Sequence, residues 1–452
     1  MAAERIDECL SVRDGRLWMD GCDLVELAAE FGTPVYAVSE QQLGRNLQRI
    51  GAAFREAWPG SDVRLLPSLK ANFSLALRRI LSRAGAGCDT FGPGELHAAL
   101  AAGVEPRLIS VNGSSKDGPL IERAVAAGAR ITLDSARELD LVIEAARRTG
   151  TRAPIRLRLR PDYDGLDQPS DFFPELDVRT AAQRYKPGIP AEQAVDLGRR
   201  ALAAPELELT GLMAHLGRHS ADPGVWRGMA VSFADLIGRC CRAWDWRPAE
   251  LDVGGGLPAL RDPTSPTGLP AAPTAVYAQA IAGTLAVELG RHGVDPAGIA
   301  LEVEPGRSLY ADAGVHLTRV RSIKEQQAPI AWRWVECDTT EMFVADLLIE
   351  HARFPVRVAS RAAQPPAVRA DLVGISCGFD VLASQVDLPA VGPGDVVALL
   401  DTGAYQDACA SNFNALPRPG TVLVSGDRAE WIKQPETVEQ VFARDVIPER
   451  LR

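Results

Sequence analysis

The 452-residue chain lacks several patterns that mark large classes of proteins. No CxxC pair occurs among its eight cysteines, which argues against a zinc site and against a disulfide framework. No run of about 18 apolar residues is present to span a bilayer, and the opening "MAAERIDECL" lacks the basic and then apolar layout of a signal peptide. The net charge of -10 disfavours binding to nucleic acid, which needs a basic face. These absences predict a cytoplasmic protein with small-molecule partners, no metal and no membrane or nucleic-acid partner.

What the chain does contain is a repeated unit, in which a β-rich apolar run is followed by a helical pattern. Strands that alternate with helices predict right-handed crossovers and a parallel sheet. Eight such units predict an α/β fold, a (β/α)8 TIM-type barrel, with its chemistry at the C-terminal ends of the strands. The eight runs are 63–70, 85–90, 107–113, 130–135, 155–160, 209–217, 250–256 and 299–307.

After Tyr310 the pattern changes to short strands separated by turns, which is typical of an all-β module. The first residues of the chain have the same hairpin character. We therefore expect a barrel domain over 35–310 and a discontinuous C-terminal all-β domain, 311–452, completed by residues 1–34.

Many residues at the predicted strand ends have side chains that can take part in catalysis or ligand binding. A random selection of strand ends would contain mostly turn-forming residues. The strand-end residues are Lys70, Asp89, Asn112, Asp134 with Ser135, Arg160, His215, Gly254 to Gly256, and Glu304 with Arg307.

A family resemblance runs in order over about 380 residues of the chain. The motifs include "YAVS", "LKAN", "GCDTFGPGEL", "LDSARELD", "KPGI", "GLMAHLG", "LDVGGGLP", "EPGRSLYADAG", "SCGFDVLA", "DTGAY" and "NFNALPRP". The chain resembles the fold-type III pyridoxal-phosphate (PLP) decarboxylases, the family of diaminopimelate, ornithine and arginine decarboxylases. The resemblance implies an alanine-racemase-like barrel with a β-domain, PLP as cofactor, and a homodimer whose active sites are shared between subunits.

Lys70 is the expected covalent anchor of the cofactor. A lysine that attacks an aldehyde needs an enclosed, rigid position where desolvation favours its neutral amine. The apolar run before Lys70 and the following Ala-Asn suit that role. The alternative is a lysine that simply emerges from a strand into solvent.

The resemblance assigns the other cofactor contacts. Glu304 matches the carboxylate that keeps the pyridine nitrogen protonated, and its alternative is an ordinary ion pair with an arginine. His215 matches an imidazole stacked on the ring, and its alternative is a core histidine. The expected cofactor-binding set is Lys70, Asp89, His215, Arg218, Gly254, Gly255, Gly256, Glu304, Gly306, Arg307 and Tyr405, of which Arg307 and Tyr405 are also expected to bind substrate.

The chain departs from the family pattern at three places. Arg218 replaces a phosphate-binding serine, and "SCGFD" is one residue shorter than the family motif. Either Cys377 or Ser376 then takes the place of the family's catalytic cysteine. Asp346 appears where diaminopimelate decarboxylases carry an arginine that binds the distal carboxylate; it is either a substrate-binding residue or part of a solvated amphipathic helix.

These departures predict a PLP-dependent decarboxylase of an amino acid or amino-acid conjugate other than diaminopimelate, in siderophore or other natural-product biosynthesis. Lys70, Cys377, Glu304 and His215 are its expected catalytic residues. Two alternatives stay open: an amino-acid racemase on the same barrel, and an inactive regulatory relative.

Overall fold

The computed structural model describes residues 4–217, 220–265, 268 and 270–452. The chain divides into two compact units. Unit 1 comprises Met1–Gly44, Arg261–Leu269 and Tyr310–Arg452, and unit 2 comprises Arg45–Leu260 and Pro270–Leu309. None of the described helices is both long and apolar enough to cross a membrane.

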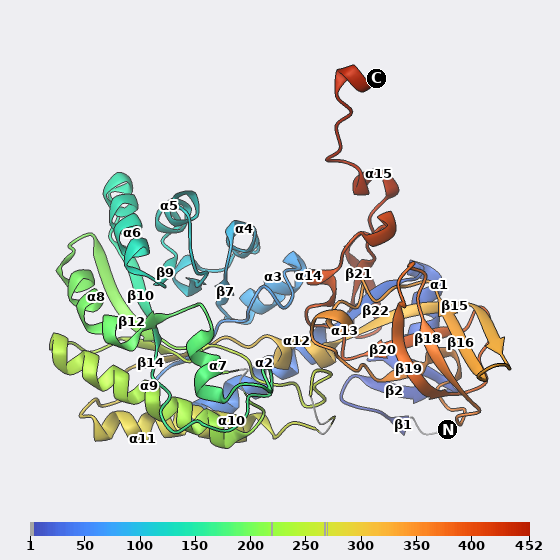
Figure 1. Ribbon diagram of the computed structural model, residues 1–452, viewed down its shortest axis with the longest axis horizontal. Helices are drawn as coiled ribbons and strands as arrows, with labels where there is room; N and C mark the ends of the chain where they lie inside the picture. The colour runs from blue at the N-terminus through green and yellow to red at the C-terminus, as the bar shows by residue number, and fades with distance from the viewer. Residues whose placement is uncertain (1–3, 218–219, 266–267, 269) are drawn as a thin grey trace. The chain divides into compact units, whose positions relative to one another are not determined.

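Unit 2 is a parallel barrel, and each of the eight predicted runs contains or overlaps one of its strands (Figure 1). Seven neighbouring pairs are joined by parallel ladders in the order β6-β14-β13-β12-β10-β9-β8-β7. The strands are β6 (Val63–Leu65), β7 (Cys88–Thr90), β8 (Ile109–Val111), β9 (Arg130–Leu133), β10 (Ala153–Arg160), β12 (Leu207–Met213), β13 (Glu250–Asp252) and β14 (Ala300–Val303), and the short β11 (Ile189–Pro190) pairs with β10.

The barrel closes between β6 and β7 through backbone hydrogen bonds outside the regular ladder. Gly87 N–H donates to the Leu65 carbonyl (3.0 Å), and Leu69 N–H donates to the Asp89 carbonyl (3.1 Å). The strand expected over 63–70 is shorter than predicted, because Pro67 has no N–H to continue a ladder. Lys70 consequently lies in a turn after β6.

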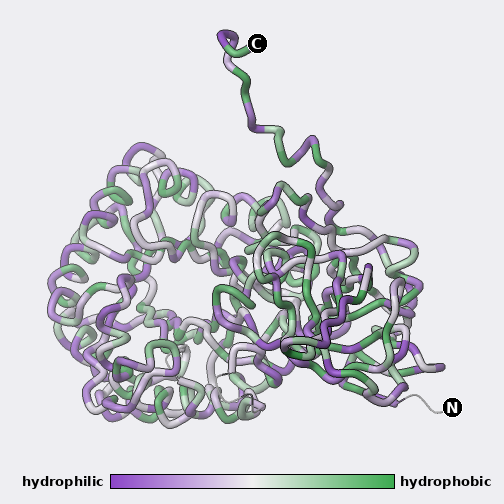
Figure 2. The backbone as a smooth tube through the Cα atoms, turned by 45° about the vertical axis from the view of Figure 1, so that its right-hand side comes forward, coloured by the Kyte–Doolittle hydropathy of each residue, from purple (hydrophilic) through white to green (hydrophobic). Residues whose placement is uncertain are grey.

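Helices surround these strands, and in Figure 2 they lie outside the ring that the strands form. Their ends follow local chemistry: the Ser135 hydroxyl accepts the Glu138 N–H at the start of α6, and Gly150 (φ 65°) ends it in the left-handed region. The helices are α2 (Glu40–Ala57), α3 (Leu75–Arg83), α4 (Pro93–Ala101), α5 (Gly118–Ala127), α6 (Ala136–Thr149), α7 (Val178–Arg184), α8 (Ala191–Ala203), α9 (Pro223–Trp244), α10 (Thr274–Ala278), α11 (Thr284–Arg291) and α12 (Arg307–Tyr310).

Unit 1 is built mainly of β-strands. A small sheet has the order β1-β2-β3-β4, and a larger one follows the path β19-β18-β16-β15-β5-β21-β22, with β20 and β17 attached beside β15. The strands are β1 (Glu4–Arg5), β2 (Leu10–Arg13), β3 (Arg16–Met19), β4 (Cys22–Asp23), β5 (Val35–Ser39), β15 (Gly314–Gln326), β16 (Trp332–Cys337), β17 (Val356–Val358), β18 (Val368–Val373), β19 (Val381–Leu388), β20 (Val396–Leu400), β21 (Gly420–Ser425) and β22 (Arg428–Lys433). The short helices are α1 (Leu24–Phe31), α13 (Asp346–Ile349), α14 (Gln406–Cys409) and α15 (Val438–Val441).

Unit 1 includes the N-terminal segment as far as Gly44. Strand β5 lies between β15 and β21 and pairs with both. Residues 35–44 therefore fold with unit 1 rather than with the barrel, and so do residues 261–269. The fold itself, a TIM-type barrel with a β-domain, is confirmed.

Candidate active site

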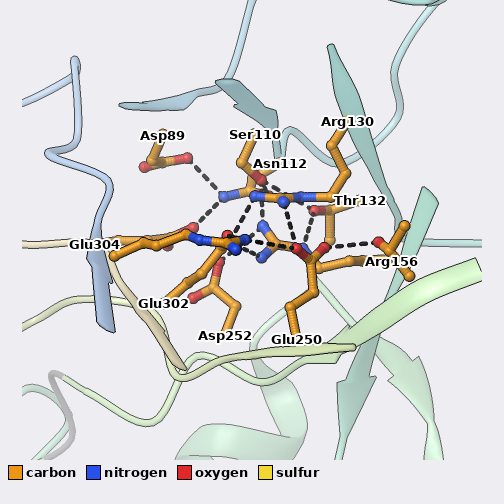
Figure 3. Close-up of polar contacts among 12 residues, drawn as sticks. Asp89, Ser110, Asn112, Arg130, Thr132, Arg156, Glu250, Asp252, Glu302 and Glu304 are labelled. Atoms are coloured by element: carbon orange, nitrogen blue, oxygen red, sulfur yellow. Dashed lines mark hydrogen bonds and ion pairs between the residues drawn. The ribbon is translucent and has the colours of Figure 1, made fainter. Parts of the chain in front are cut away.

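Three polar side chains from different strand ends meet inside unit 2 (Figure 3). Asn112 follows β8, Asp89 lies in β7 and Glu304 follows β14. The Asn112 amide Nδ2 donates to Asp89 Oδ1 (2.8 Å) and also to Glu304 Oε1. All three side chains are buried, so these three strand-end residues lie together inside unit 2.

Lys70 is tied to this group through Asp89. Its Nζ lies 3.6 Å from Asp89 Oδ2, which also accepts a hydrogen bond from the Ser68 hydroxyl (2.6 Å). The expectation of an enclosed lysine is wrong for the chain as it stands, because 48% of the Lys70 side chain is exposed. The turn that follows Pro67 carries it out of the strand and leaves it reachable.

Lys116 shows the opposite arrangement. Its side chain is buried, pairs with Glu138 (2.9 Å) and donates to the Thr132 carbonyl (2.7 Å). Burial lowers its pKa, while Glu138 works against that shift. The Lys116 amine is thus engaged with neighbouring groups of the barrel and is not accessible. Lys70 is the better candidate for a covalent anchor.

A buried cluster of ions fills the barrel interior beside Glu304 (Figure 3). Arg156 on β10 is fully buried, and its guanidinium contacts Asp252 Oδ2 (2.8 Å) and Glu302 Oε2 (2.5 Å). Arg130 on β9 contacts Glu250 Oε2 (2.6 Å) and the same Glu302 oxygen (2.5 Å). Opposite charges from four strands are thereby paired at close range, as buried charges require.

Glu304 differs from these paired carboxylates. Burial raises its pKa well above the ordinary value, and the neighbouring carboxylates of Asp252 and Asp89 raise it further, with only partial relief from Arg156. The Glu304 carboxyl therefore binds a proton more readily than an exposed glutamate does. That property suits a group facing a basic ring nitrogen.

The glycines of "LDVGGGLP" leave space between His215 and Glu304. A Cβ on Gly254, which has φ of 72°, would clash with the His215 imidazole, and a Cβ on Gly255 would clash with the Glu304 carbonyl. Gly254 N–H donates to Asp252 Oδ1 (2.7 Å), and Gly255 N–H donates to His215 Nδ1 (3.3 Å). The backbone N–H groups of Gly254 and Gly255, two of the three expected to bind a phosphate, thus donate to side chains of this chain. His215 accepts one of these hydrogen bonds at Nδ1.

Arg307 is buried at the start of α12, directly after Gly306. Together with the glycines and Glu304, it provides a cation, backbone without side chains and a buried carboxyl with a raised pKa on neighbouring strand ends. These residue types fit PLP, which needs an anion site and a partner for its ring nitrogen. Arg218, the remaining expected cofactor contact in this region, lies outside the described residues.

Two residues of unit 1, Tyr405 and Asp346, are also expected to contact the cofactor or the substrate. Tyr405 precedes α14 with φ of 68°. Asp346 is only 2% exposed, which rules out the solvated helix considered from the sequence. Its carboxylate Oδ2 accepts from the Gln406 amide (3.1 Å), whose oxygen in turn accepts the Asp346 N–H (3.1 Å).

The loop that carries Cys377 is held rigidly by Asp380. The Asp380 carboxylate accepts the N–H groups of Glu341 and Ser376, each at 2.6 Å, and its backbone has φ of 50°. Cys377 is exposed, and the neighbouring Phe379 is 97% exposed. The loop presents a thiol and an aromatic ring outward on a fixed backbone.

Several residues of the site were missed by sequence reasoning. Glu95 accepts the Phe91 N–H (2.6 Å), and burial together with Asp89 raises its pKa to about 7. Ser110, Arg156 and Asp252 complete the contacts around Asn112 and Glu304. Only Glu95 is marked in the sequence, by "GEL" in the first turn of the helix after β7. The other three have the sequence pattern of ordinary strand residues.

Known proteins share this architecture and sequence. Residues 25–311 match the family described as "Pyridoxal-dependent decarboxylase, pyridoxal binding domain". The chain is 31% identical over 443 residues to the diaminopimelate decarboxylase of Archaeoglobus fulgidus, covering 98% of this chain and 99% of the relative. It is 30% identical over 445 residues to that of Methanothermobacter thermautotrophicus, covering 97% of each. The crystal structure of diaminopimelate decarboxylase from Methanocaldococcus jannaschii in co-complex with L-lysine is similar with a TM-score of 0.89 and 28% identity, over 98% of this chain and 99% of that chain.

These similarities overturn one expectation from the sequence. The sequence predicts a substrate other than diaminopimelate, because Asp346 stands where those enzymes carry an arginine for the distal carboxylate, yet the nearly full-length relatives are diaminopimelate decarboxylases. The physical reason for the error is that Asp346 is buried and hydrogen-bonded to Gln406. Its charge cannot be assigned to a substrate pocket from its sequence position.

Proposed function

Because the chain belongs to the pyridoxal-dependent decarboxylase family, we propose that it decarboxylates diaminopimelate to lysine. The chain is a PLP-dependent amino-acid decarboxylase by its family. The observation that supports this substrate is the similarity over 98% of the chain to a diaminopimelate decarboxylase whose structure contains L-lysine. Lysine is what remains when one carboxylate of diaminopimelate leaves as CO2.

PLP, when bound, supplies a ring that accepts the electrons left at Cα after CO2 departs. Lys70 would hold the cofactor covalently, since its amine is reachable and lies beside Asp89. The Glu304 carboxyl, whose pKa is raised by burial and by Asp252 and Asp89, would face the ring nitrogen and share a proton with it. Gly254 to Gly256 and Arg307 would bind the phosphate, and His215 would pack against the ring.

The test of this function is product analysis with meso-diaminopimelate. The purified protein with PLP should release CO2 and lysine in equal amounts, while lysine, ornithine and arginine should give little or no CO2. Release of CO2 from one of these three but not from diaminopimelate would contradict the proposed substrate. Conversion of meso-diaminopimelate to another stereoisomer without release of CO2 would contradict decarboxylation itself.

We propose further that the enzyme is a homodimer in the cytoplasm. Its eight cysteines all lie in the described part of the chain and form no disulfide bond with one another, as suits a reducing compartment. The loop held by Asp380 exposes Cys377 and Phe379, where a second copy of the chain can contact them. In that assembly Cys377, or Ser376 beside it, would serve the partner's site, and Tyr405 would complete a phosphate site.

Mixing inactive chains tests the shared site. Lys70→Ala and Cys377→Ala chains should each be inactive and should regain activity after subunit exchange, because a hybrid dimer contains one intact site. No recovery after exchange verified by mass spectrometry, or full activity in a sedimenting monomer, would contradict shared sites.

A further inference from the structure

We propose that Asn112 is a positioning residue that sets the arrangement and charge of Asp89 and Glu304. The inference rests on the proposed function, because these carboxylates are the groups expected to face the cofactor. One amide nitrogen donates to both of them, at 2.8 Å to Asp89 Oδ1 and at close range to Glu304 Oε1. Asn112 thus links the lysine side of the site to the ring-nitrogen side.

The direction of the Asn112 amide follows from the chemistry of its neighbours. Arg156 Nη2 donates to the Ser110 hydroxyl, and a guanidinium can only donate. Ser110 must therefore accept from Arg156, and its single proton is available for Asn112 Oδ1, 2.7 Å away. The amide oxygen is held toward Ser110, and the amide nitrogen is left to face the two carboxylates (Figure 3).

These five side chains form a series of hydrogen bonds that all run in one direction. It begins at a buried cation, passes through a hydroxyl and an amide, and ends at two acceptors. Bonds arranged in this way polarise one another in a low-dielectric interior. An asparagine here does what an aspartate of the same shape cannot do, because only the amide carries N–H donors.

Three charged groups act on Glu304 from the strands around it: Asp252 on β13, Asp89 on β7 and Arg156 on β10. Asp89 in turn faces Lys70 and Glu95. A donor to a carboxylate favours its charged form. Loss of the Asn112 donors should therefore make Glu304 take up its proton at higher pH.

The experiment uses the PLP-loaded enzyme without substrate, and follows the absorbance of the bound cofactor as a function of pH. In Asn112→Asp the donors disappear and a third carboxylate is added, so the spectral transition should move up by about one pH unit or more. In Ser110→Ala the amide loses its orienting partner, so a smaller shift in the same direction is expected. The kcat of Asn112→Asp should fall about 10- to 100-fold while the cofactor stays bound.

Thr210→Val is the matched control, because it removes a hydrogen bond to Glu250 (2.6 Å) in the same ion cluster while keeping the side-chain volume. It should lower the melting temperature but leave the spectral transition in place. If Asn112→Asp fails to fold, Ser110→Ala against Thr210→Val decides the question. Unshifted transitions in the Asn112 and Ser110 variants, or an equal shift in Thr210→Val, would overturn the proposal. Since the titration needs no substrate, it is independent of whether diaminopimelate is decarboxylated.

Discussion

Lys70 Nζ lies 3.6 Å from Asp89 Oδ2, so the exposed lysine is held beside a buried carboxylate. We predict that borohydride reduction of the PLP-loaded protein fixes the cofactor on Lys70. Peptide mapping is straightforward, because the chain has only five lysines. The buried Lys116, paired with Glu138, should remain unlabelled. A label on another lysine would show that the anchor has been misassigned.

Glu304→Gln should retain the cofactor but slow decarboxylation by roughly 10²- to 10⁴-fold. The neutral amide has the same shape but cannot hold a proton at the oxygen or balance a charged ring nitrogen. Steady-state kinetics and cofactor absorbance measure the two effects separately. Turnover close to that of the wild type would identify Glu304 as an ordinary structural carboxylate.

Glu302→Gln, two residues earlier on β14, should instead weaken the fold. Glu302 is fully buried, and one of its oxygens is shared by Arg130 and Arg156. Removing one partner of a buried ion pair costs about 3–5 kcal/mol in free energy of unfolding, which urea titration measures. Glu206→Gln, which breaks a pair with Arg147, whose side chain is 66% exposed, should change that free energy little. Equal effects would mean that the buried cluster adds no stability of its own.

Glu95→Gln should change the pH dependence of stability. The folded-state pKa of about 7 lies above the ordinary 4.5, because of burial and the neighbouring Asp89. The native state then holds this proton more tightly than the unfolded chain, so the added stability is present below about pH 4.5 and is lost as the pH rises through 7. Glutamine mimics the protonated form at every pH. The melting temperature of the variant relative to the wild type should therefore rise between about pH 5 and pH 8, whereas a pH-independent difference would contradict the shift.

The barrel strands could be predicted from the sequence because parallel strands covered by helices leave a local apolar signature. The boundary between the units could not. Strand β5 looks like the first strand of a barrel, but it pairs with β15 and β21, whose residues lie hundreds of positions away. Pairing over such distances leaves no local signal. Strand β6 is shorter than the apolar run 63–70 predicts, because Pro67 has no N–H with which to continue the ladder.

The positions of Lys70, Asp89, Asn112 and Glu304 at strand ends were visible in the sequence, but their mutual contacts were not. Strand β10 reads "IRLRLR", which resembles a strand with one polar and exposed face. Arg156 is nevertheless fully buried, because its acidic partners come from β13 and β14. The sequence position of Asp346 suggests a charge available to a substrate, but its carboxylate accepts a hydrogen bond from Gln406, which lies in a distant segment of the chain.

The closure of the barrel between β6 and β7 has a consequence for motion. This junction relies on irregular bonds from residues 65–69 to Gly87 and Asp89, whereas the other junctions have parallel ladders between named strands. Local opening is easiest where few regular backbone bonds must break together. Amide protons at this junction should exchange with solvent sooner than those of β9, β10 and β12. A cofactor held by Lys70 beside Asp89 would lie next to the β6–β7 junction. Cofactor binding should therefore slow amide exchange at this junction, and the exchange rate there would report whether the cofactor is bound.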